Sequence, residues 1–321
     1  MRILHLIPLI PTLFRLQAHG LKIACSQMWI EHTPLSYAAN NFYNSDSDTA
    51  SLISGGVPNL QDTTVDLAGN AETQGLLNYV QNRNYRLIGI IVEVTYRLVA
   101  NKAAGITSLA DLRGKRVGTI PRTSAEVFVR QLLANGGGLS PEDYTTVSGW
   151  VCMREPCGAD TFPAQLADGT IDAFGVWETA VELGIRALGD DAVVFKNSSV
   201  YREVYSLYST EEKLADAGTR KKIVEFVRAL NQTYDVFRGA PDDDADGVYT
   251  TVGELIRVDV PVLKSVWADH VWGPGSLEKD LVDYLEVEDQ YLAEVDRREP
   301  LSRAELERFV DTSVYEEAMQ G

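Results

Sequence analysis

Residues 106–135, ITSLADLRGKRVGTIPRTSAEVFVRQLLAN, decide the fold. They predict a short helix at 108–112, then a turn, a strand at 116–119 and a second helix that begins after Thr123. Glu126 follows Thr123 at the spacing of a capping box, so Thr123 is the expected N-cap. A strand that leads directly into a helix start leaves backbone N–H groups free to bind an anion. The stretch therefore predicts a ligand-binding crevice and requires no catalytic group.

The segment SLADLRGKRVGT at 108–119 resembles the start of the second lobe of type II periplasmic solute-binding proteins. Three further segments resemble this family in order and spacing: HTPLSYAANNFY at 32–43, QLADGTIDAFGVWETA at 165–180 and LERFVDTSVYEEA at 306–318. The branch they resemble most contains sulfonate-binding, taurine-binding and THI5-like pyrimidine-related proteins. The resemblance covers nearly the whole chain and implies a two-lobed α/β fold with a ligand cleft between the lobes. Because this fold carries both transport receptors and some enzymes, it restricts function only weakly.

Short apolar strands alternate with helices along the chain, which predicts an α/β fold with mostly parallel sheets. The expected strands are LKIAC (21–25), TVDLA (64–68), RLIGIIVE (86–93), RLVAN (97–101), RVGT (116–119), IDAFGV (171–176), AVVF (192–195) and VYSLYS (204–209). Members of the family usually have a strand soon after the first helix. Here the corresponding segment TASLISGG, at 49–56, has a helical pattern. We therefore expect this strand to be missing or shortened in the first lobe.

The lobe boundaries follow from two strands that lie back to back, at 86–93 and 97–101. Such a pair lets the chain leave one sheet and start towards another. We expect the first lobe to comprise 21–101 together with 205–321, and the second lobe to comprise 102–204.

Composition excludes several classes of protein. The chain has 321 residues, 45% hydrophobic and 23% charged, with a net charge of −17. This charge makes nucleic acid and anionic membranes poor partners, and no apolar stretch is long enough to span a membrane. The three cysteines do not suggest a disulfide scaffold; Cys152 and Cys157 are close enough to pair, but a reduced state is equally compatible. The scattered histidines show no zinc spacing, so we predict no structural metal. We also expect no cofactor and a monomer.

Residues 1–20 form a candidate signal peptide. Arg2 is a short basic start, 3–14 is apolar, and Ala18 is a candidate residue before the cleavage site. A functional leader predicts a periplasmic or secreted protein. Without it, the protein would stay in the cytoplasm.

The candidate binding residues lie in four loops that follow strands or precede helices, because ligands of α/β proteins bind at these ends. They are Gln27, Trp29, His32, Asn70, Glu72, Thr73, Arg122, Thr123, Ser124, Trp177 and Glu178.

Several of these candidates have both a binding interpretation and a structural one. Trp29 and Trp177 suit a sandwiched ring or alkyl chain, or packing between the lobes. The hydroxyls of Thr123 and Ser124 cap a helix and also suit a sulfonate, carboxylate or phosphate. Glu72 suits a ligand amine or a pyrimidine amino group, or it is a charge at a helix start. Arg122 could bind an anion or lie at the surface of its lobe. After the cleft tryptophan, the pair Glu178-Thr179 replaces the acidic-proline pair that is usual in this family.

The function favoured by the resemblance is a solute-binding protein. It would capture a sulfonate, carboxylate or pyrimidine-like molecule in the cleft and deliver it to the permease of an ABC-type importer. The alternative is an enzyme on the same fold, with THI5-like pyrimidine synthesis or desulfinase-like chemistry. That alternative would need Cys25 as a nucleophile and His32 as its base. The iron-associated cysteine motif of the pyrimidine synthases is absent, which favours a receptor over an enzyme.

Overall fold

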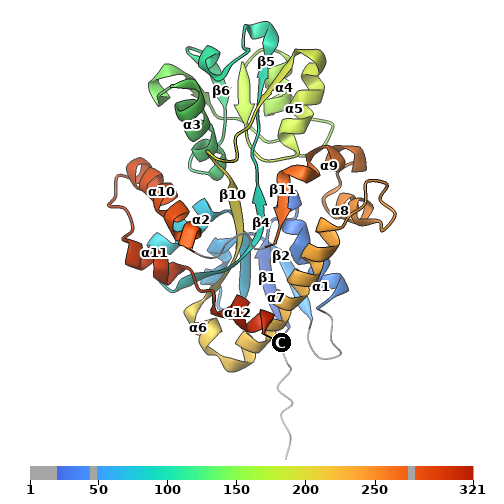
Figure 1. The fold of residues 1–321 in the computed structure, drawn as a ribbon, viewed down its shortest axis with the longest axis vertical. Coiled ribbons are helices and arrows are strands. Elements are labelled where there is room, and N and C mark those ends of the chain that lie inside the picture. Colours follow the sequence, from blue (N-terminus) through green and yellow to red (C-terminus); the bar gives the residue numbers. More distant parts are fainter. Residues whose placement is uncertain (1–19, 44–48, 274–278, 321) are drawn as a thin grey trace, which may run out of the picture.

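The computed structural model describes residues 20–43, 49–273 and 279–320, and its strands form two sheets. Figure 1 shows one sheet above the other, each flanked by helices. The larger sheet has the strand order β11-β4-β10-β3-β1-β2. Its strands are β1 (Leu21–Cys25), β2 (Ala50–Ser54), β3 (Leu67–Asn70), β4 (Tyr85–Val94), β10 (Glu203–Thr210) and β11 (His270–Trp272). This is the predicted two-lobed α/β class.

The smaller sheet has the strand order β7-β6-β8-β5-β9. Its strands are β5 (Leu98–Asn101), β6 (Arg116–Gly118), β7 (Thr145–Val147), β8 (Ala173–Gly175) and β9 (Ala192–Phe195). The boundary predicted after residue 101 assigned β5 to the first lobe. Its hydrogen bonds are instead with β8 and β9, so the smaller sheet already includes the chain from Leu98.

Two connections carry the chain between the sheets, from β4 into β5 and from β9 into β10. β10 runs antiparallel to β4, from Glu203 opposite Val94 to Thr210 opposite Tyr85. β10 also pairs antiparallel with β3, as does β5 with both of its neighbours. Both sheets are therefore mixed, and the expectation of mostly parallel sheets was wrong. The physical reason is that the strands that leave and re-enter the larger sheet run in opposite directions.

Residues 50–54 form strand β2, which corrects the expected helix. β2 pairs in parallel with β1, from Leu21 opposite Ala50 to Cys25 opposite Ser54. It is the edge strand of the larger sheet, and Leu52 packs against the buried core. Pairing with β1 overrides the local helical pattern, because a strand gains most of its stability from neighbours on the sheet. The first lobe therefore has a strand at the place where we expected one to be missing or shortened.

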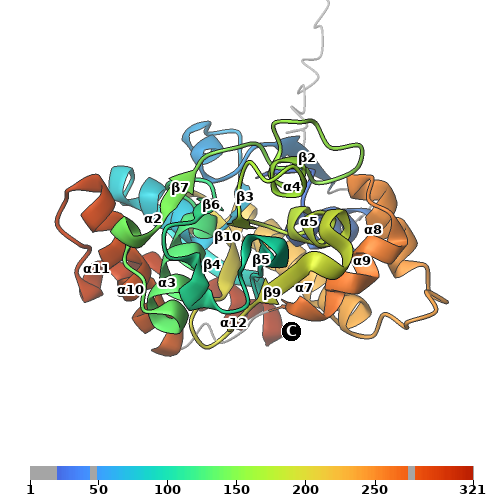
Figure 2. The same ribbon diagram turned by 90° about the horizontal axis from the view of Figure 1, so that it is seen from above.

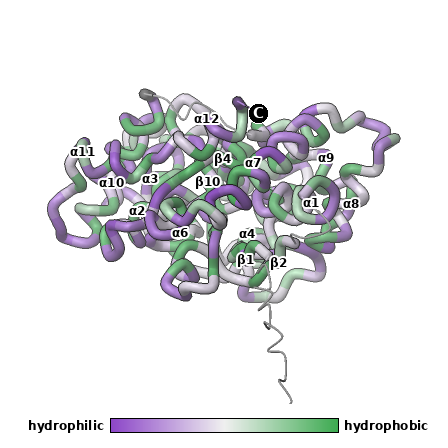
Figure 3. Tube along the Cα trace, turned by 90° about the horizontal axis from the view of Figure 1, so that it is seen from below, coloured by the Kyte–Doolittle hydropathy of each residue, from purple (hydrophilic) through white to green (hydrophobic). Residues whose placement is uncertain are grey.

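Helices cover both sheets. The α-helices are α1 (Thr33–Asn41), α2 (Glu72–Gln81), α3 (Ser124–Gly137), α4 (Phe162–Ala167), α5 (Ala180–Leu188), α6 (Glu211–Ala215), α7 (Ala217–Arg238), α8 (Val248–Ile256), α9 (Val260–Val266), α10 (Lys279–Asp296), α11 (Arg303–Phe309) and α12 (Ser313–Met319). The long helix α7 buries an apolar stripe that includes Ile223, Phe226 and Phe237. Polar and apolar residues alternate along the outer helices, as Figure 3 shows. Their apolar positions therefore pack inwards while the polar positions meet water.

Helix α10 connects the two lobes. It packs against α2 of the first lobe. It also lies beside α3 of the second lobe, as seen from above in Figure 2, where Gln131 Nε2 donates to Glu288 Oε1 over 3.4 Å. At the other end of this contact the Arg122 guanidinium forms an ion pair with Asp296. The C-terminal region thus helps to hold the lobes in one relative position.

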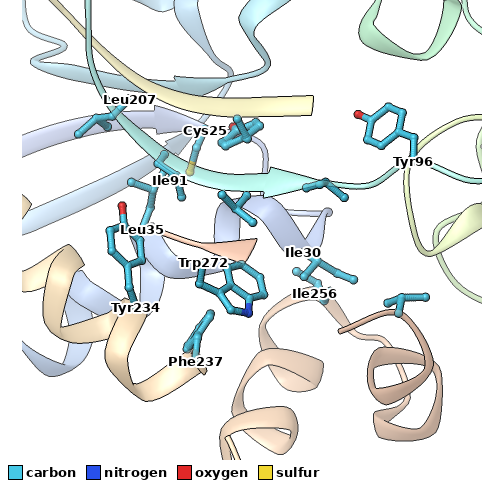
Figure 4. Packing of buried hydrophobic residues seen from close by; sticks show 14 of the residues in the cluster. Cys25, Ile30, Leu35, Ile91, Tyr96, Leu207, Tyr234, Phe237, Ile256 and Trp272 are labelled. Atoms are coloured by element: carbon cyan, nitrogen blue, oxygen red, sulfur yellow. The ribbon is translucent and has the colours of Figure 1, made fainter. Parts of the chain in front are cut away.

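The apolar core beneath the larger sheet is built from aromatic and aliphatic side chains (Figure 4). Phe237 of α7 is fully buried there. Its ring centroid lies 5.2 Å from that of Tyr37, 5.4 Å from Trp267 and 5.0 Å from Trp272. These contacts fix α1, α7 and the segment that contains β11 against each other.

Three sequence expectations concern the covalent and membrane state of the chain. Cys152 and Cys157, whose pairing the sequence left open, form a disulfide. None of the helices within the described residues is both long and apolar enough to cross a membrane. The candidate signal peptide at 1–20 lies outside the described residues, apart from Gly20.

We predict that Phe237→Ala lowers the free energy of unfolding by about 3–5 kcal/mol, because it removes a large buried side chain and leaves a cavity. Urea denaturation followed by circular dichroism measures this change. Trp150→Ala is the control, because Trp150 is 70% exposed and its loss should cost no more than about 0.5 kcal/mol. A cost for Phe237→Ala as small as that of the control would contradict the packing described here.

Candidate functional site

A cavity of about 210 Å³ lies between the two lobes. The first lobe and β10 contribute Trp29, Glu31, Asn70, Ala71, Thr73, Gln74, Glu203 and Tyr205 to its wall, and the second lobe contributes Thr123, Ser124 and Trp177. Six of the predicted binding residues thus come together: Trp29, Asn70, Thr73, Thr123, Ser124 and Trp177. The volume lies below the roughly 300–1,000 Å³ of pockets for drug-sized molecules, so the cavity suits a small ligand.

Two helix starts face this cavity. β3 ends at Asn70 just before α2, and α3 begins at Ser124 after the turn that follows β6. Thr123 is the N-cap of α3, as predicted, but the predicted capping box is absent. Its hydroxyl donates to the carbonyl oxygen of Ile120 over 2.7 Å, while Glu126 accepts from the backbone N–H of Arg122 over 2.8 Å. Arg122 has a φ of 61°, and this left-handed turn lets its N–H approach the Glu126 carboxylate.

Trp29 and Trp177 stack on each other across the lobes, with ring centroids 5.3 Å apart and planes inclined by 29°. The indole N–H of Trp177 lies 3.3 Å from the hydroxyl oxygen of Ser124 and donates to it. The pair leaves no space for a sandwiched ring in this conformation.

A second, more apolar cavity of about 630 Å³ shares both tryptophans and includes Ile120 and Trp150, so the stacked pair stands between the two cavities. A larger cavity, of about 720 Å³ around Lys22, contains none of the predicted site residues.

Glu72 was predicted to bind a ligand, but its side chain is not part of the cavity wall. One carboxyl oxygen accepts from the hydroxyl of Tyr201 over 2.9 Å, and the other accepts from the backbone N–H of Val204 over 2.8 Å. Burial raises the pKa of this carboxyl to about 7, against the lowering effect of these hydrogen bonds. Glu72 therefore fastens the start of α2 to the chain that enters β10.

Glu178, also predicted to bind a ligand, is held by a buried ion pair. Its Oε1 lies 2.7 Å from Nε of Arg97, and Arg97 Nη2 donates to Glu182 over 3.2 Å. Arg97 lies between β4 and β5, so this contact fixes the loop of Trp177 to the crossing between the lobes. Sequence reasoning missed Arg97, although an arginine between two apolar strands could have indicated a buried partner.

Three other predicted residues border the site without lining it. His32 is buried, and its Nδ1 lies 2.5 Å from the hydroxyl of Tyr205. Burial lowers the pKa of His32 well below its usual value, which keeps the imidazole neutral. Gln27 is exposed. Arg122 directs its guanidinium to Asp296 on α10 instead of the cavity.

Cys25 lies at the end of β1 and is fully buried. Burial raises the pKa of its thiol to about 12, because the apolar surroundings disfavour the charged thiolate. Near neutral pH the side chain is therefore a neutral thiol, whereas a cysteine nucleophile reacts as the thiolate. The geometry gives Cys25 a packing role and little reactivity.

The sequence analysis did not select Glu31 and Glu203, which both line the cavity. Each is only 1% exposed. Both carboxyl oxygens of Glu31 and Oε2 of Glu203 accept no hydrogen bond from another described residue. Burial raises the pKa of Glu31 to about 8, with a smaller contribution from the charge of Glu178, and it raises the pKa of Glu203 well above its usual range. The cavity therefore contains two acids that stay protonated at a pH where exposed glutamates are ionised.

Two signals in the sequence could have found these acids. Glu31 lies two residues before the first α-helix, in the same segment as the predicted Trp29 and His32. Glu203 is the one charged residue in the strand EVYSLYST, in which every residue is buried. A charged side chain in such a strand requires a partner or a function.

We predict that Glu31→Gln makes the empty protein more stable than the wild type by an amount that grows with pH. The folded protein keeps the Glu31 proton up to about pH 8, whereas the unfolded chain releases it near 4.5. The native state therefore binds more protons between these values, so wild-type stability falls as pH rises. The groups that face Glu31 are Glu178, Glu203, Tyr96 and Tyr205.

Urea denaturation at about pH 5 and about pH 8 measures this effect, whose expected size is on the order of a few kcal/mol. The exposed Glu307→Gln is a matched control that should show the pH dependence of the wild type. Equal pH dependence in Glu31→Gln and Glu307→Gln would contradict the assignment.

Comparison with solved structures identifies the fold. The alkanesulfonate-binding protein SsuA from Xanthomonas axonopodis pv. citri, bound to MOPS, is similar with a TM-score of 0.69 and 16% identity, covering 91% of this chain and 98% of that one. The periplasmic aliphatic sulphonate binding protein SsuA from Escherichia coli gives a TM-score of 0.70 at 12% identity, covering 89% and 91%. The desulfurization enzyme DSZB gives 0.60 at 18% identity, covering 94% and 99%. At these identities the likeness establishes the periplasmic-binding-protein fold alone.

Comparison of sequences identifies the family. No curated protein sequence matches the chain significantly. Residues 54–244, more than half of the chain, match the family described as NMT1/THI5 like. This match confirms the resemblance seen in the sequence, and the chain therefore belongs to the NMT1/THI5-like family.

Proposed function

We propose that this protein is a solute-binding receptor that closes its two lobes around a small organic molecule. The observation that carries the proposal is the cavity of about 210 Å³ whose wall combines side chains from both lobes. A site divided in this way is complete only when the lobes approach each other. Ligand binding and hinge closure would then be coupled, as in other two-lobed binding proteins.

Contacts between the lobes support this proposal. Trp29 stacks on Trp177, and the side-chain amide of Gln74 donates to the carbonyl oxygen of Arg122 over 3.2 Å. The described conformation is therefore a closed one. Opening it would break these contacts and expose the cavity to solvent, while each sheet stays intact.

The proposed binding residues are the six predicted side chains in the wall, with Trp29 and Trp177 as the aromatic surfaces. Four predicted binding residues lie outside the wall and hold neighbouring elements in place: His32, Glu72, Arg122 and Glu178. The fifth, Gln27, is exposed. The candidate ligand classes are those suggested by the sequence: a sulfonate, a carboxylate or a pyrimidine-like molecule. Delivery to an ABC-type permease by a periplasmic or secreted monomer remains part of the proposal.

The alternative function, an enzyme on the same fold, has less support. The similarity to the enzyme DSZB concerns the fold, at 18% identity. The chemistry proposed for that alternative requires a thiolate at Cys25, but this thiol is buried and its pKa is raised to about 12. A buried neutral thiol does not act as a nucleophile near neutral pH.

We predict that Trp177→Ala weakens binding of the molecule that co-purifies with the protein by about 1–3 kcal/mol, because it removes an aromatic contact in the cavity wall. The molecule is released by denaturation, identified by mass spectrometry and titrated into refolded protein by calorimetry. Trp150→Ala is the control, because this exposed tryptophan lines only the second cavity.

Small-angle X-ray scattering before and after the titration measures the closure. The wild type should become more compact when the molecule binds. The proposal fails if no molecule is recovered, or if the molecule binds without compaction and with the same affinity in Trp177→Ala.

A further inference from the structure

The cavity contains more hydrogen-bond acceptors than its own walls satisfy. Both carboxyl oxygens of Glu31 and Oε2 of Glu203 have no partner among the described residues, and the hydroxyl oxygen of Thr73 is likewise unpaired. All three residues line the cavity and are at most 1% exposed. Buried polar groups are almost always hydrogen-bonded in native proteins, so these oxygens, which line a cavity between the lobes, are available to a bound molecule.

No positive side chain from the described part of the chain lines the cavity to balance these acids. The buried guanidinium of Arg97 is engaged by Glu178 and Glu182. That of Arg122 is engaged by Asp296. Ionisation of Glu31 and Glu203 therefore needs a compensating charge from the ligand.

The two helix starts act in the opposite sense, because they favour negative charge. Each helix N-terminus is equivalent to about +0.5 of an elementary charge, so α2 and α3 together supply about +1. The ionised carboxyls of Glu31 and Glu203 would supply −2. Once a bound cation has ionised both carboxyls, the balance is therefore about −1, which suits that cation and disfavours an anion.

The aromatic side chains of the wall also favour a positively charged ligand. Trp29, Trp177 and Tyr205 present ring surfaces to the same cavity. The face of an aromatic ring attracts a cation, and tryptophan does so most strongly. The same rings also suit the flat body of a small conjugated ligand.

We propose that the cavity selects a small organic cation whose N–H groups donate to the carboxylates of Glu31 and Glu203. This inference rests on the proposed receptor function; it excludes sulfonates and carboxylates from the candidate ligands and favours amines, amidines and protonated amino-heterocycles. Because the empty acids hold their protons, binding of such a cation displaces protons from the carboxyls into solution. Affinity should therefore increase with pH until both carboxyls are ionised.

The test uses three probes that share one ring and differ in the head group: benzamidinium, benzoate and benzenesulfonate. Each is titrated by calorimetry into the full chain after unfolding and refolding have removed any bound molecule. We expect benzamidinium to bind about 10- to 100-fold more tightly than either anion, the range for a charged hydrogen bond. Its affinity should increase between about pH 6 and about pH 8.

The double variant Glu31→Gln, Glu203→Gln should lose the same factor, about 10- to 100-fold, for benzamidinium. Glu307→Gln is the control, because Glu307 is an exposed carboxyl of α11 that lies outside the cavity wall. Its benzamidinium affinity should equal that of the wild type, and circular dichroism checks that each variant is folded.

The inference is overturned if either anion binds more tightly than benzamidinium, or if the double variant binds benzamidinium as well as the wild type does. It is also overturned if none of the three probes binds to the refolded protein. A further contradicting result is that Zn²⁺, titrated alone, binds to the wild type and not to the double variant, because the two acids would then hold a metal ion. In each of these cases the receptor function can still hold, because it is tested separately by the molecule that co-purifies.

Discussion

Burial of the Glu31 and Glu203 carboxyls in the closed cleft is the interaction on which the account of this protein depends. An ionised carboxylate without a partner in such a place would cost several kcal/mol, so in the empty protein both groups keep their protons. A ligand that supplies positive charge reverses this preference. In the proposed receptor, protonation, ligand binding and closure of the lobes are linked through the same two side chains.

The fold explains how two acids from distant parts of the chain meet. Glu31 precedes the first helix, whereas Glu203 begins β10, the strand that returns from the second lobe. β10 lies beside β3, so the returning strand enters the cleft next to the loop of Asn70. On the opposite side Arg97 holds Glu178, and with it the loop that carries Trp177. The crossing thus positions both walls of the cavity.

The sequence predicts which strand ends and helix starts surround the site better than it predicts which carboxylates face the cavity. Strand ends and helix starts are local features, so Asn70, Thr73, Ser124 and Trp177 could be selected from the order of the elements. What a carboxylate contacts depends on residues far away in the sequence. Glu72 was therefore predicted to face the ligand, although it is satisfied by the chain around Val204.

The wrong predictions about the fold have the same cause, namely contacts between residues that are far apart in the sequence. β2 at 50–54 has a helical local pattern, and only pairing with β1 makes it a strand. The strands β7 and β11 were not predicted; each has three residues and lies at the edge of its sheet, where only one neighbouring strand supports it. The predicted strand at 204–209 began one residue after Glu203, which is the first residue of β10. Glu203 was therefore not considered as part of a buried strand.

The central claim is that the two acids of the cavity are neutral when it is empty and ionised when it is filled. Infrared difference spectroscopy with benzamidinium measures this directly, since protonated and ionised carboxyls absorb at different frequencies. We expect the band of buried protonated carboxyl groups to decrease as a carboxylate band appears in the wild type. Neither change should occur in the Glu31→Gln, Glu203→Gln variant. A protonated-carboxyl band that stays constant while benzamidinium binds to the wild type would contradict the account.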